Sequence, residues 1–239
     1  PIVPVPPYKG ASKMNPYADL MMQVDGHMGE LLAALKQAGI DDDTLVFFTS
    51  DNGCSPQGNF EKLAEFGHDP SAGYRGHKAD IYEGGHRVPF LVRWPGKVKP
   101  GSSSDQIVSI TDVFATCAEI IGRSLPEDAA EDSVSFLNCL LGKQVGPFRV
   151  ASVQQSGKKS FALRKGKWKL IDHGDGRHEL FDLEADLGET LDLHGKQPEV
   201  ARELAGLLQS YLDRGRSTPG PALPLSHKVS LDEVRYKKK

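Results

Sequence analysis

The sequence has 239 residues, a length that suits one large domain or a medium-sized domain with a smaller one. Its 29 Lys and Arg residues against 32 Asp and Glu residues give a net charge of −3, which provides no general attraction to nucleic acid or anionic membranes. No apolar run is long enough to cross a bilayer, and three cysteines without a CxxC pair argue against a disulfide framework and a structural zinc site.

The N-terminal part is predicted to be a helix followed by a strand. Asn15 and Pro16 provide an N-cap and a first helical position, and apolar residues then recur at helical spacing until Gly39. Residues 45–49 are apolar without alternation, which is typical of a strand covered on both faces. This order predicts an α/β layered domain with a mainly parallel sheet.

A long loop is predicted at residues 51–87, and an apolar strand follows at 88–94. Loops of this length inside a compact domain are usually functional. Thr111 is predicted to cap an amphipathic helix that runs to Ile121, and a second short helix is expected at 135–141.

The C-terminal part is predicted to be a small α+β subdomain. Turn residues separate four short β-like runs, and Pro198 begins an amphipathic helix. The runs are at residues 150–153, 160–164, 168–171 and 179–183. We expect an α/β domain at 1–144, an antiparallel sheet with one helix at 145–215, and an extended tail at 216–239.

Asp51 and Asn52 directly follow the first predicted strand. In open α/β sheets, ligands bind beyond the carboxyl ends of strands, and carboxylate and amide oxygens suit Ca²⁺ or Mg²⁺ better than zinc. Gly53 lets the chain turn away from such a site. The alternative is that "SDNG" is only a turn. Cys54 has no His or Lys beside it in the sequence, which favours an inert thiol over a nucleophile.

A second polar stretch is "GYRGHKADIYEGGHRVPF", which contains the cations Arg75 and Lys78 on a loop before a strand. A lysine can hold an oxyanion or give a proton to a leaving group. His77 adjoins Lys78 and is the histidine expected to approach such a site. Gly84 and Gly85 permit a tight or positive-φ turn. The alternative is a loop that carries ordinary surface charges.

Together, "TLVFFTSDNG" and "YRGHKADIYEGGHRVPFLVRWPG" strongly resemble the type I sulfatases, the formylglycine-dependent arylsulfatase family of the alkaline phosphatase superfamily. The similarity extends to "NPYADLMMQVDGHMGELLAALKQAGI" before them and to "LRKGKWKLI" and "HELFDLEADLGET" after them. The resemblance implies an alkaline-phosphatase-like layered α/β fold, followed by a small α+β subdomain, and the hydrolysis of sulfate esters.

The resemblance also implies roles for individual residues. Asp51 and Asn52 correspond to calcium ligands of the family. Lys78 corresponds to a lysine that contacts the substrate sulfate near the leaving oxygen, and His77 is a weaker candidate for substrate contact. The calcium ion and the cations would neutralise sulfate charge as the S–O bond breaks. The implied substrate is a sulfate ester, such as a sulfated carbohydrate, and the implied location is periplasmic or secreted.

The nucleophile motif of the family is not found in this sequence. The family oxidises the cysteine of C-x-P-x-R to formylglycine, whereas "CSPQG" at Cys54 has Gly58 in the place of the arginine. Cys54 also follows the Asp-Asn strand instead of preceding it. We therefore expect that the chain resembles the C-terminal part of a sulfatase, that the formylglycine lies elsewhere, and that this chain alone turns over little substrate.

Two other functions stay open. A phosphonate monoester or phosphodiester hydrolase of the same superfamily is one, although such enzymes often carry a His where Asn52 stands. The other is a non-catalytic fragment that binds a sulfated glycan or a partner chain. An incomplete α/β domain would also expose apolar sheet surface, through which the chain could self-associate.

Overall fold

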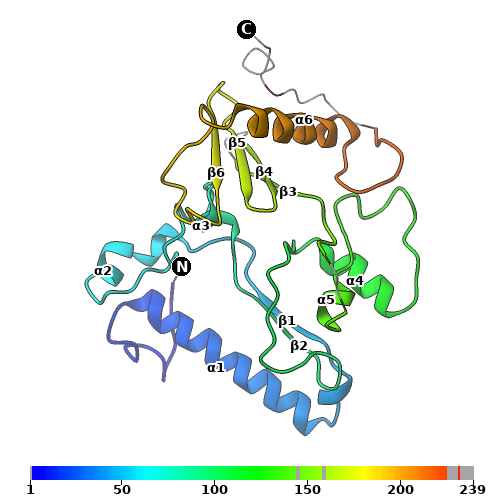
Figure 1. Ribbon diagram of the computed structural model, residues 1–239. Coiled ribbons are helices and arrows are strands. Elements are labelled where there is room, and N and C mark those ends of the chain that lie inside the picture. Colours follow the sequence, from blue (N-terminus) through cyan, green and yellow to red (C-terminus); the bar gives the residue numbers. More distant parts are fainter. Residues whose placement is uncertain (1, 144–145, 158–159, 225–230, 232–239) are drawn as a thin grey trace. The chain divides into compact units, whose positions relative to one another are not determined.

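The computed structural model describes residues 2–143, 146–157, 160–224 and 231 (Figure 1). The chain forms two compact units, Pro1–Pro100 and Gly101–Lys239. The domain limits predicted from the sequence stay predictions. Residues 144 and 145, where the first limit falls, lie outside the described residues, as does most of the expected tail at 216–239. No helix within the described ranges is long and apolar enough to cross a membrane.

The described residues of the first unit form one long helix, four very short helical segments and a pair of strands. In chain order the elements are α1 (Pro16–Gln37), a 3₁₀ turn (Asp41–Asp43), β1 (Val46–Thr49), a second 3₁₀ turn (Pro56–Gly58), α2 (Phe60–Ala64), α3 (Glu83–His86) and β2 (Phe90–Arg93). The predicted loop at 51–87 is found only in part: residues 65–82, between α2 and α3, have neither helix nor strand, whereas the second 3₁₀ turn, α2 and α3 lie inside the predicted range.

The start of α1 is as the sequence predicted. The Asn15 side chain accepts a hydrogen bond from the backbone N–H of Ala18 at 2.9 Å, and Pro16 occupies the first turn. The Asn15 amide also donates to the carbonyl of Gly58 at 2.8 Å, so the same residue ties the helix to the segment that follows Cys54. This bond brings the helix N-terminus close to the loop that carries the candidate site.

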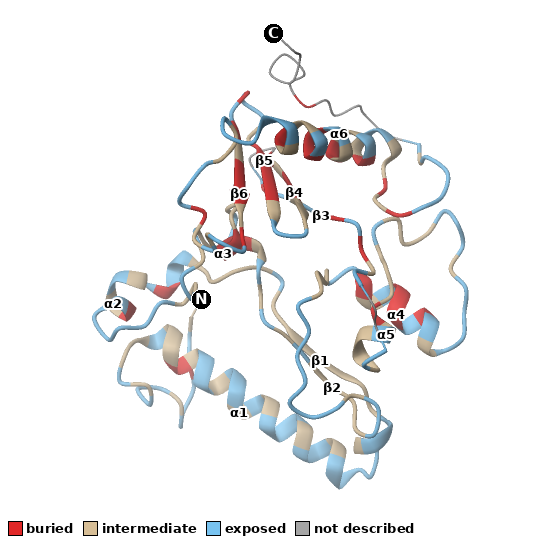
Figure 2. Cartoon of the chain, in the orientation of Figure 1, coloured by how far each residue is buried: buried red, intermediate tan, exposed pale blue. Residues whose placement is uncertain are grey.

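The strands β1 and β2 are antiparallel, with Val46 opposite Arg93 and Thr49 opposite Phe90. The expectation of a mainly parallel sheet is therefore wrong for this pair. All four residues of β1 are only half-buried, so the expected burial on both faces is also not found (Figure 2). β1 stays half-buried because no third strand joins this sheet within the described part of the unit.

The second unit contains two short helices, a four-stranded sheet and a long helix. Its elements are α4 (Asp112–Ile120), α5 (Leu137–Leu140), β3 (Ser152–Gln155), β4 (Phe161–Lys165), β5 (Trp168–Asp172), β6 (His178–Asp182) and α6 (Pro198–Arg214). The strands follow one another in the order β3-β4-β5-β6, and every pair is antiparallel. The structure thus confirms the antiparallel sheet and the helix predicted for this region.

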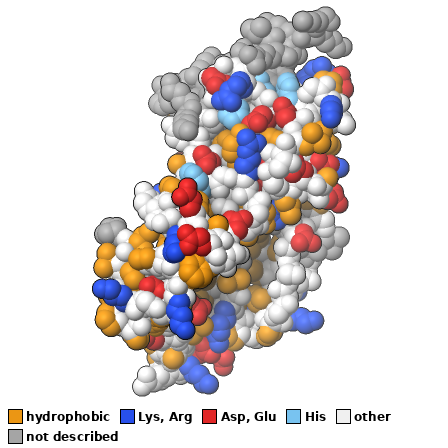
Figure 3. Space-filling view, turned by 90° about the vertical axis from the view of Figure 1, so that its left-hand side faces the viewer, with side chains coloured by type: hydrophobic (Ala, Val, Ile, Leu, Met, Phe, Trp, Pro, Cys, Tyr) orange, Lys and Arg blue, Asp and Glu red, His pale blue; other side chains and the backbone are white. Residues whose placement is uncertain are grey.

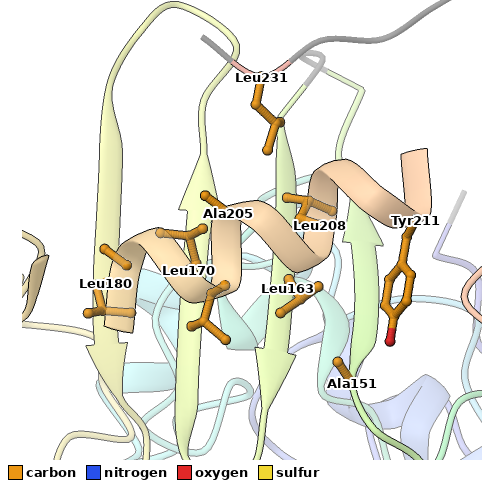
Figure 4. Close-up of a cluster of buried hydrophobic side chains, with 10 residues drawn as sticks. Ala151, Leu163, Leu170, Leu180, Ala205, Leu208, Tyr211 and Leu231 are labelled. Carbon is orange, nitrogen blue, oxygen red and sulfur yellow. The ribbon is translucent and has the colours of Figure 1, made fainter. Parts of the chain in front are cut away.

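Helix α6 lies across one face of the sheet and buries its apolar side (Figures 2 and 4). Leu204 and Leu208 of the helix pack in one cluster with Leu163, Leu170 and Leu180 of successive strands, and all five are at most 1% exposed. Full burial of such a side chain contributes about 1.5–3 kcal/mol. This cluster is the core of the second unit.

The start of α4 differs from the prediction. Thr111 makes no capping hydrogen bond with its side chain. The fully buried carboxylate of Asp112 makes the contacts at this helix end instead. It accepts hydrogen bonds from the backbone N–H of Ser109 at 2.7 Å and of Val134 at 2.9 Å, and it forms an ion pair with Arg149. A buried carboxylate needs several such partners, and the sequence motif alone does not reveal them.

Candidate functional site

Asp51 and Asn52 follow β1 directly, as predicted. The Asp51 side chain is exposed, and its carboxylate has no hydrogen bond or ion pair with any residue that the structure describes. The Asn52 side chain donates to the carbonyl of Gly53 at 2.9 Å. This bond uses the amide nitrogen of Asn52, so its amide oxygen is the side-chain atom left for a ligand.

Lys78 is tied by its backbone to the same loop. Its N–H donates to the carbonyl of Cys54 at 2.9 Å. The side chain is exposed, and its ammonium group makes no ion pair within the described ranges of the chain. The structure therefore brings the Lys78 backbone next to the residues that follow Asn52, and leaves the charge of Lys78 available to a ligand.

Three segments meet at this point through their backbones. Gly53 N–H donates to the carbonyl of Gly85 in α3 at 2.9 Å, and Gly84 N–H donates to the carbonyl of Arg75 at 2.7 Å. Together with the bond from Lys78, these contacts join the loop after β1, the loop at 75–78 and helix α3. We call this junction the three-segment crossing.

The glycines of α3 have a different role from the predicted one. Gly84 and Gly85 are part of a helix and are not among the residues with positive φ. A Cβ on Gly84 would lie 2.2 Å from the carbonyl oxygen of Gly76, and a Cβ on Gly85 would lie 2.2 Å from that of Asp80. Glycine is needed at both positions because backbones approach closely, whereas Gly76 has a φ of +79°.

His77 takes part in the internal structure of its loop. Its Nδ1 lies 3.0 Å from the carbonyl oxygen of Lys78 and 3.4 Å from Oδ2 of Asp80, and its ring centroid lies 5.8 Å from that of Phe60. Asp80, which the sequence reasoning missed, also accepts from the N–H of His77 at 3.1 Å. The available signal was the spacing of an Asp three residues after His77 in a turn-rich segment.

The thiol of Cys54 is half-buried and lies 3.1 Å from the hydroxyl of Ser71. A serine hydroxyl does not act as an activating base for a thiol. Tyr17 of α1 lies near this thiol. Burial, and to a smaller extent the charge of Cys54, raise the pKa of Tyr17 above its ordinary value, so Tyr17 is not a base that could activate the thiol. This geometry offers no activation of Cys54 as a nucleophile.

Two arginines of the same region stack on tyrosines. The guanidinium of Arg75 lies 3.7 Å from the ring centroid of Tyr82, and that of Arg87 lies 4.9 Å from the ring centroid of Tyr74. Arg87 also pairs with the buried Glu83 at 3.5 Å. Stacking of this kind restrains the arginine side chains and keeps positive charge close to the three-segment crossing.

The residues present could supply part, but not all, of the coordination shell of a hard divalent cation. Across the described residues there is no group of three or more His, Cys, Asp or Glu side chains that could hold a metal ion. The Asp51 carboxylate and the Asn52 amide oxygen have the right chemistry, but Ca²⁺ takes six to eight oxygen ligands. Further ligands would have to come from backbone carbonyls, water, substrate or other residues.

Family profiles match almost the whole of the described chain. A profile described as sulfatase matches residues 5–122, and a profile described as the C-terminal part of N-sulphoglucosamine sulphohydrolase matches residues 76–216. Among curated proteins, the N-acetylgalactosamine-6-O-sulfatase of Bacteroides thetaiotaomicron is 39% identical over 234 residues, which cover 90% of this chain and 45% of that protein.

Solved structures agree. A 6S-sulfatase structure from Bacteroides thetaiotaomicron, determined in work on the metabolism of multiple glycosaminoglycans, has a TM-score of 0.80 and 39% identity, and covers 88% of this chain and 47% of its own. A second structure, BT4656 in complex with its substrate D-glucosamine-2-N,6-O-disulfate, has a TM-score of 0.65 and 26% identity, and covers 80% of this chain and 38% of its own.

These matches confirm the predicted α/β fold class of the alkaline-phosphatase type. The chain spans about half the length of the first curated relative, 45%. The positions assigned to individual site residues stay predictions. On the profile matches and on the similarity along the whole sequence, the chain belongs to the sulfatase family.

Proposed function

We propose that the complete protein that carries this sequence hydrolyses sulfate esters, and that this chain supplies Lys78 and part of the metal site. The observation that carries the proposal is the three-segment crossing. It ties the Lys78 backbone to Cys54 at 2.9 Å, three residues after Asp51, while the side chains of Lys78 and Asp51 keep no partner within the described residues. A lysine charge and hard-oxygen ligands, carried by two segments that are joined through their backbones, suit an oxyanion substrate.

The contribution of Lys78 is electrostatic. Its ammonium is a compact charge with three donors, so it can bind the sulfate oxygens and stabilise the charge that develops on the leaving oxygen. The backbone bonds of the crossing hold the residue before the reaction begins, which limits reorganisation. His77 would contact substrate only through Nε2, because Nδ1 faces the Lys78 carbonyl at 3.0 Å.

Sulfatases generally bind a divalent metal ion, and we propose Ca²⁺ at Asp51 and Asn52. The two oxygen donors support this choice, because calcium prefers carboxylate and carbonyl oxygens. A bound cation would neutralise part of the sulfate charge. The nucleophile, a formylglycine by resemblance to the family, is proposed to lie outside this sequence.

We further propose a sulfated carbohydrate as substrate and a periplasmic or secreted location. Two relatives support the substrate class. One is named for N-acetylgalactosamine-6-O-sulfate hydrolysis, and another was solved with a disulfated glucosamine as its substrate.

The test is hydrolysis of N-acetylgalactosamine 6-sulfate and of an aryl sulfate by the complete protein with Ca²⁺. Lys78→Ala is expected to lower kcat about 10²–10³-fold, the usual cost of removing one donor to a developing oxyanion. Lys97→Ala is the control, since Lys97 is also exposed but lies in the turn after β2. Full activity of Lys78→Ala, a preference for phosphonate esters, or glycan binding without hydrolysis would each overturn the proposal.

We also propose that the apolar surface of the first unit can mediate self-association. Leu31 of α1 and Leu91 of β2 are both 62% exposed, and a groove of about 210 Å³ between Met28, Leu32 and the strands is lined mainly by apolar residues. Hydrophobic side chains also reach the surface on the face drawn in Figure 3. Sedimentation of this chain over a concentration series tests the proposal, and a monomer at every concentration would contradict it.

A further inference from the structure

The side chain of Ser71 links two parts of the candidate site. Its Oγ lies 3.1 Å from the Cys54 thiol and 3.0 Å from the carbonyl oxygen of Gly76. A carbonyl can only accept, so the Ser71 hydroxyl donates to Gly76 and the Cys54 S–H donates to Ser71. The result is a directed chain of two hydrogen bonds from the loop after β1 to the turn that contains Lys78.

The same turn is held a second time through the backbone. Lys78 N–H donates to the carbonyl of Cys54 at 2.9 Å, so Cys54 bonds to the turn directly through its backbone and, through Ser71, by its side chain. Ser71 is itself oriented by Asp69, whose carboxylate accepts from Ser71 N–H at 2.9 Å and from Gly73 N–H at 2.6 Å.

Gly76 is the residue of this turn to which Ser71 bonds directly. Its φ of +79° is a backbone conformation open to glycine, and glycine adds no side-chain packing that could restrain it. Ser71 supplies a restraint at the carbonyl of this residue, two positions before Lys78. Loss of the hydroxyl would therefore remove one restraint on the turn while the side chain of Lys78 stays unchanged.

We propose that Ser71 is a positioning residue for Lys78. The hydrogen bonds from Cys54 to Ser71 and from Ser71 to Gly76 set the position of the turn at 76–78 relative to Asp51 and Asn52. This inference rests on the proposed role of Lys78 in sulfate ester hydrolysis. The restraint that Ser71 places on the loop does not depend on that activity.

The kinetic test uses the complete protein with an aryl sulfate. Ser71→Ala is expected to lower kcat about tenfold with little change in KM, because a displacement of about 1 Å can cost up to about 100-fold when it affects the transition state. Ser71→Thr keeps the hydroxyl and should recover most of kcat. Ser55→Ala is the matched control, since the Ser55 hydroxyl bonds to Gln57 and not to the turn.

Hydrogen exchange supplies the readout that does not depend on activity. Ser71→Ala should speed exchange of the Lys78 amide, whose acceptor is Cys54, more than that of the Gly84 amide, whose acceptor is Arg75. If Ser71→Ala fails to fold, Cys54→Ser and Cys54→Ala replace it, and only the serine variant keeps a donor to Ser71.

The outcomes separate the two proposals. An unchanged kcat in Ser71→Ala, with or without faster exchange at Lys78, overturns the positioning role. Equal losses in Ser71→Ala and Ser71→Thr also overturn it, because the hydroxyl would then not be the group that matters. A wild-type protein without sulfatase activity, in which Ser71→Ala still speeds exchange selectively at Lys78, overturns the proposed function and supports the restraint on the turn.

Discussion

A Cβ atom on Gly53 would lie 1.8 Å from the carbonyl oxygen of Gly84. At the same place the N–H of Gly53 donates to the carbonyl of Gly85 at 2.9 Å. The loop that carries Asp51 and Asn52 therefore lies directly against the backbone of α3. Because the obstructing atom belongs to the backbone of a buried helix, it cannot move aside as the end of a side chain could.

Gly53→Ala is expected to destabilise the protein by about 1–3 kcal/mol, the usual cost of overpacking, and to displace the Asp51–Asn52 loop. Gly29→Ala is the matched control, because Gly29 lies inside α1 and an added Cβ would meet nothing within 4 Å. Alanine there should stabilise by up to about 1 kcal/mol. Thermal unfolding of both variants measures the contrast, and a Gly53→Ala protein as stable as wild type would contradict the close approach.

Much of the secondary structure could be predicted from the sequence. The cap at Asn15, the four β-like runs and the helix that begins at Pro198 depend on local signals, namely a capping side chain, turn residues between short runs, and helical spacing. The antiparallel pairing of β1 and β2 could not be predicted, because strand direction depends on which distant segments meet. An apolar run looks the same in a parallel sheet and in this half-buried pair.

The candidate site was predicted only in part. Residue types that carry chemistry stand out in a sequence, so Asp51, Asn52 and Lys78 could be selected. Ser71 could not be, since its partner Cys54 is 17 positions away and a serine in a polar loop gives no signal. The requirement for glycine at Gly53 was likewise attributed to a turn, because close approach between backbones is visible only in three dimensions.

Metal binding should depend on Asp51. Titration of the complete protein with Ca²⁺ is expected to show at least tenfold weaker binding for Asp51→Ala than for wild type, since a carboxylate is lost from a shell of hard oxygen ligands. Asp43→Ala is the control, because Asp43 is also exposed but lies in the 3₁₀ turn before β1. Calorimetry gives the affinities directly, and equal Ca²⁺ affinity of the two variants would rule out Asp51 as a ligand.

The second unit contains a buried ion pair on the sheet face opposite α6. Lys169 Nζ lies 2.8 Å from Glu189 Oε1, and neither side chain is exposed. Lys169→Met is expected to cost about 3–5 kcal/mol, because it removes the positive charge of Lys169 from beside a buried carboxylate. The double variant Lys169→Met/Glu189→Gln should recover part of this loss, since no full charge stays buried.

An exposed pair in the same unit provides the comparison. Lys165 and Glu203 approach to 2.5 Å, but both side chains are well exposed, and breaking such a pair costs about 0–1 kcal/mol. Urea denaturation of Lys165→Met and Lys169→Met measures both costs. Similar values for the two variants would show that burial does not decide the strength of the Lys169–Glu189 contact.

The hairpin between β5 and β6 should make the stability of the second unit sensitive to acid. Burial raises the pKa of Asp172. Two hydrogen bonds, from His178 and from the N–H of Gly174, lower it, as do the charges of His178 and His173. Together these interactions outweigh burial and hold the pKa of Asp172 below its ordinary value. The bonds measure 3.2 Å to His178 Nε2 and 2.6 Å to Gly174 N.

A carboxylate with a lowered pKa in the folded state stabilises the protein above the pKa of the unfolded chain, about 3.9. This stabilisation is lost as the pH falls through the lower pKa of the folded state. Asp172→Asn should therefore be less stable than wild type at pH 7, and the difference should shrink below about pH 4. Asp105→Asn, at an exposed position, is the control. Thermal unfolding from pH 7 to pH 3 measures the stability of both variants. If wild type and Asp172→Asn differ in stability by the same amount across this range, Asp172 stabilises the hairpin without its charge.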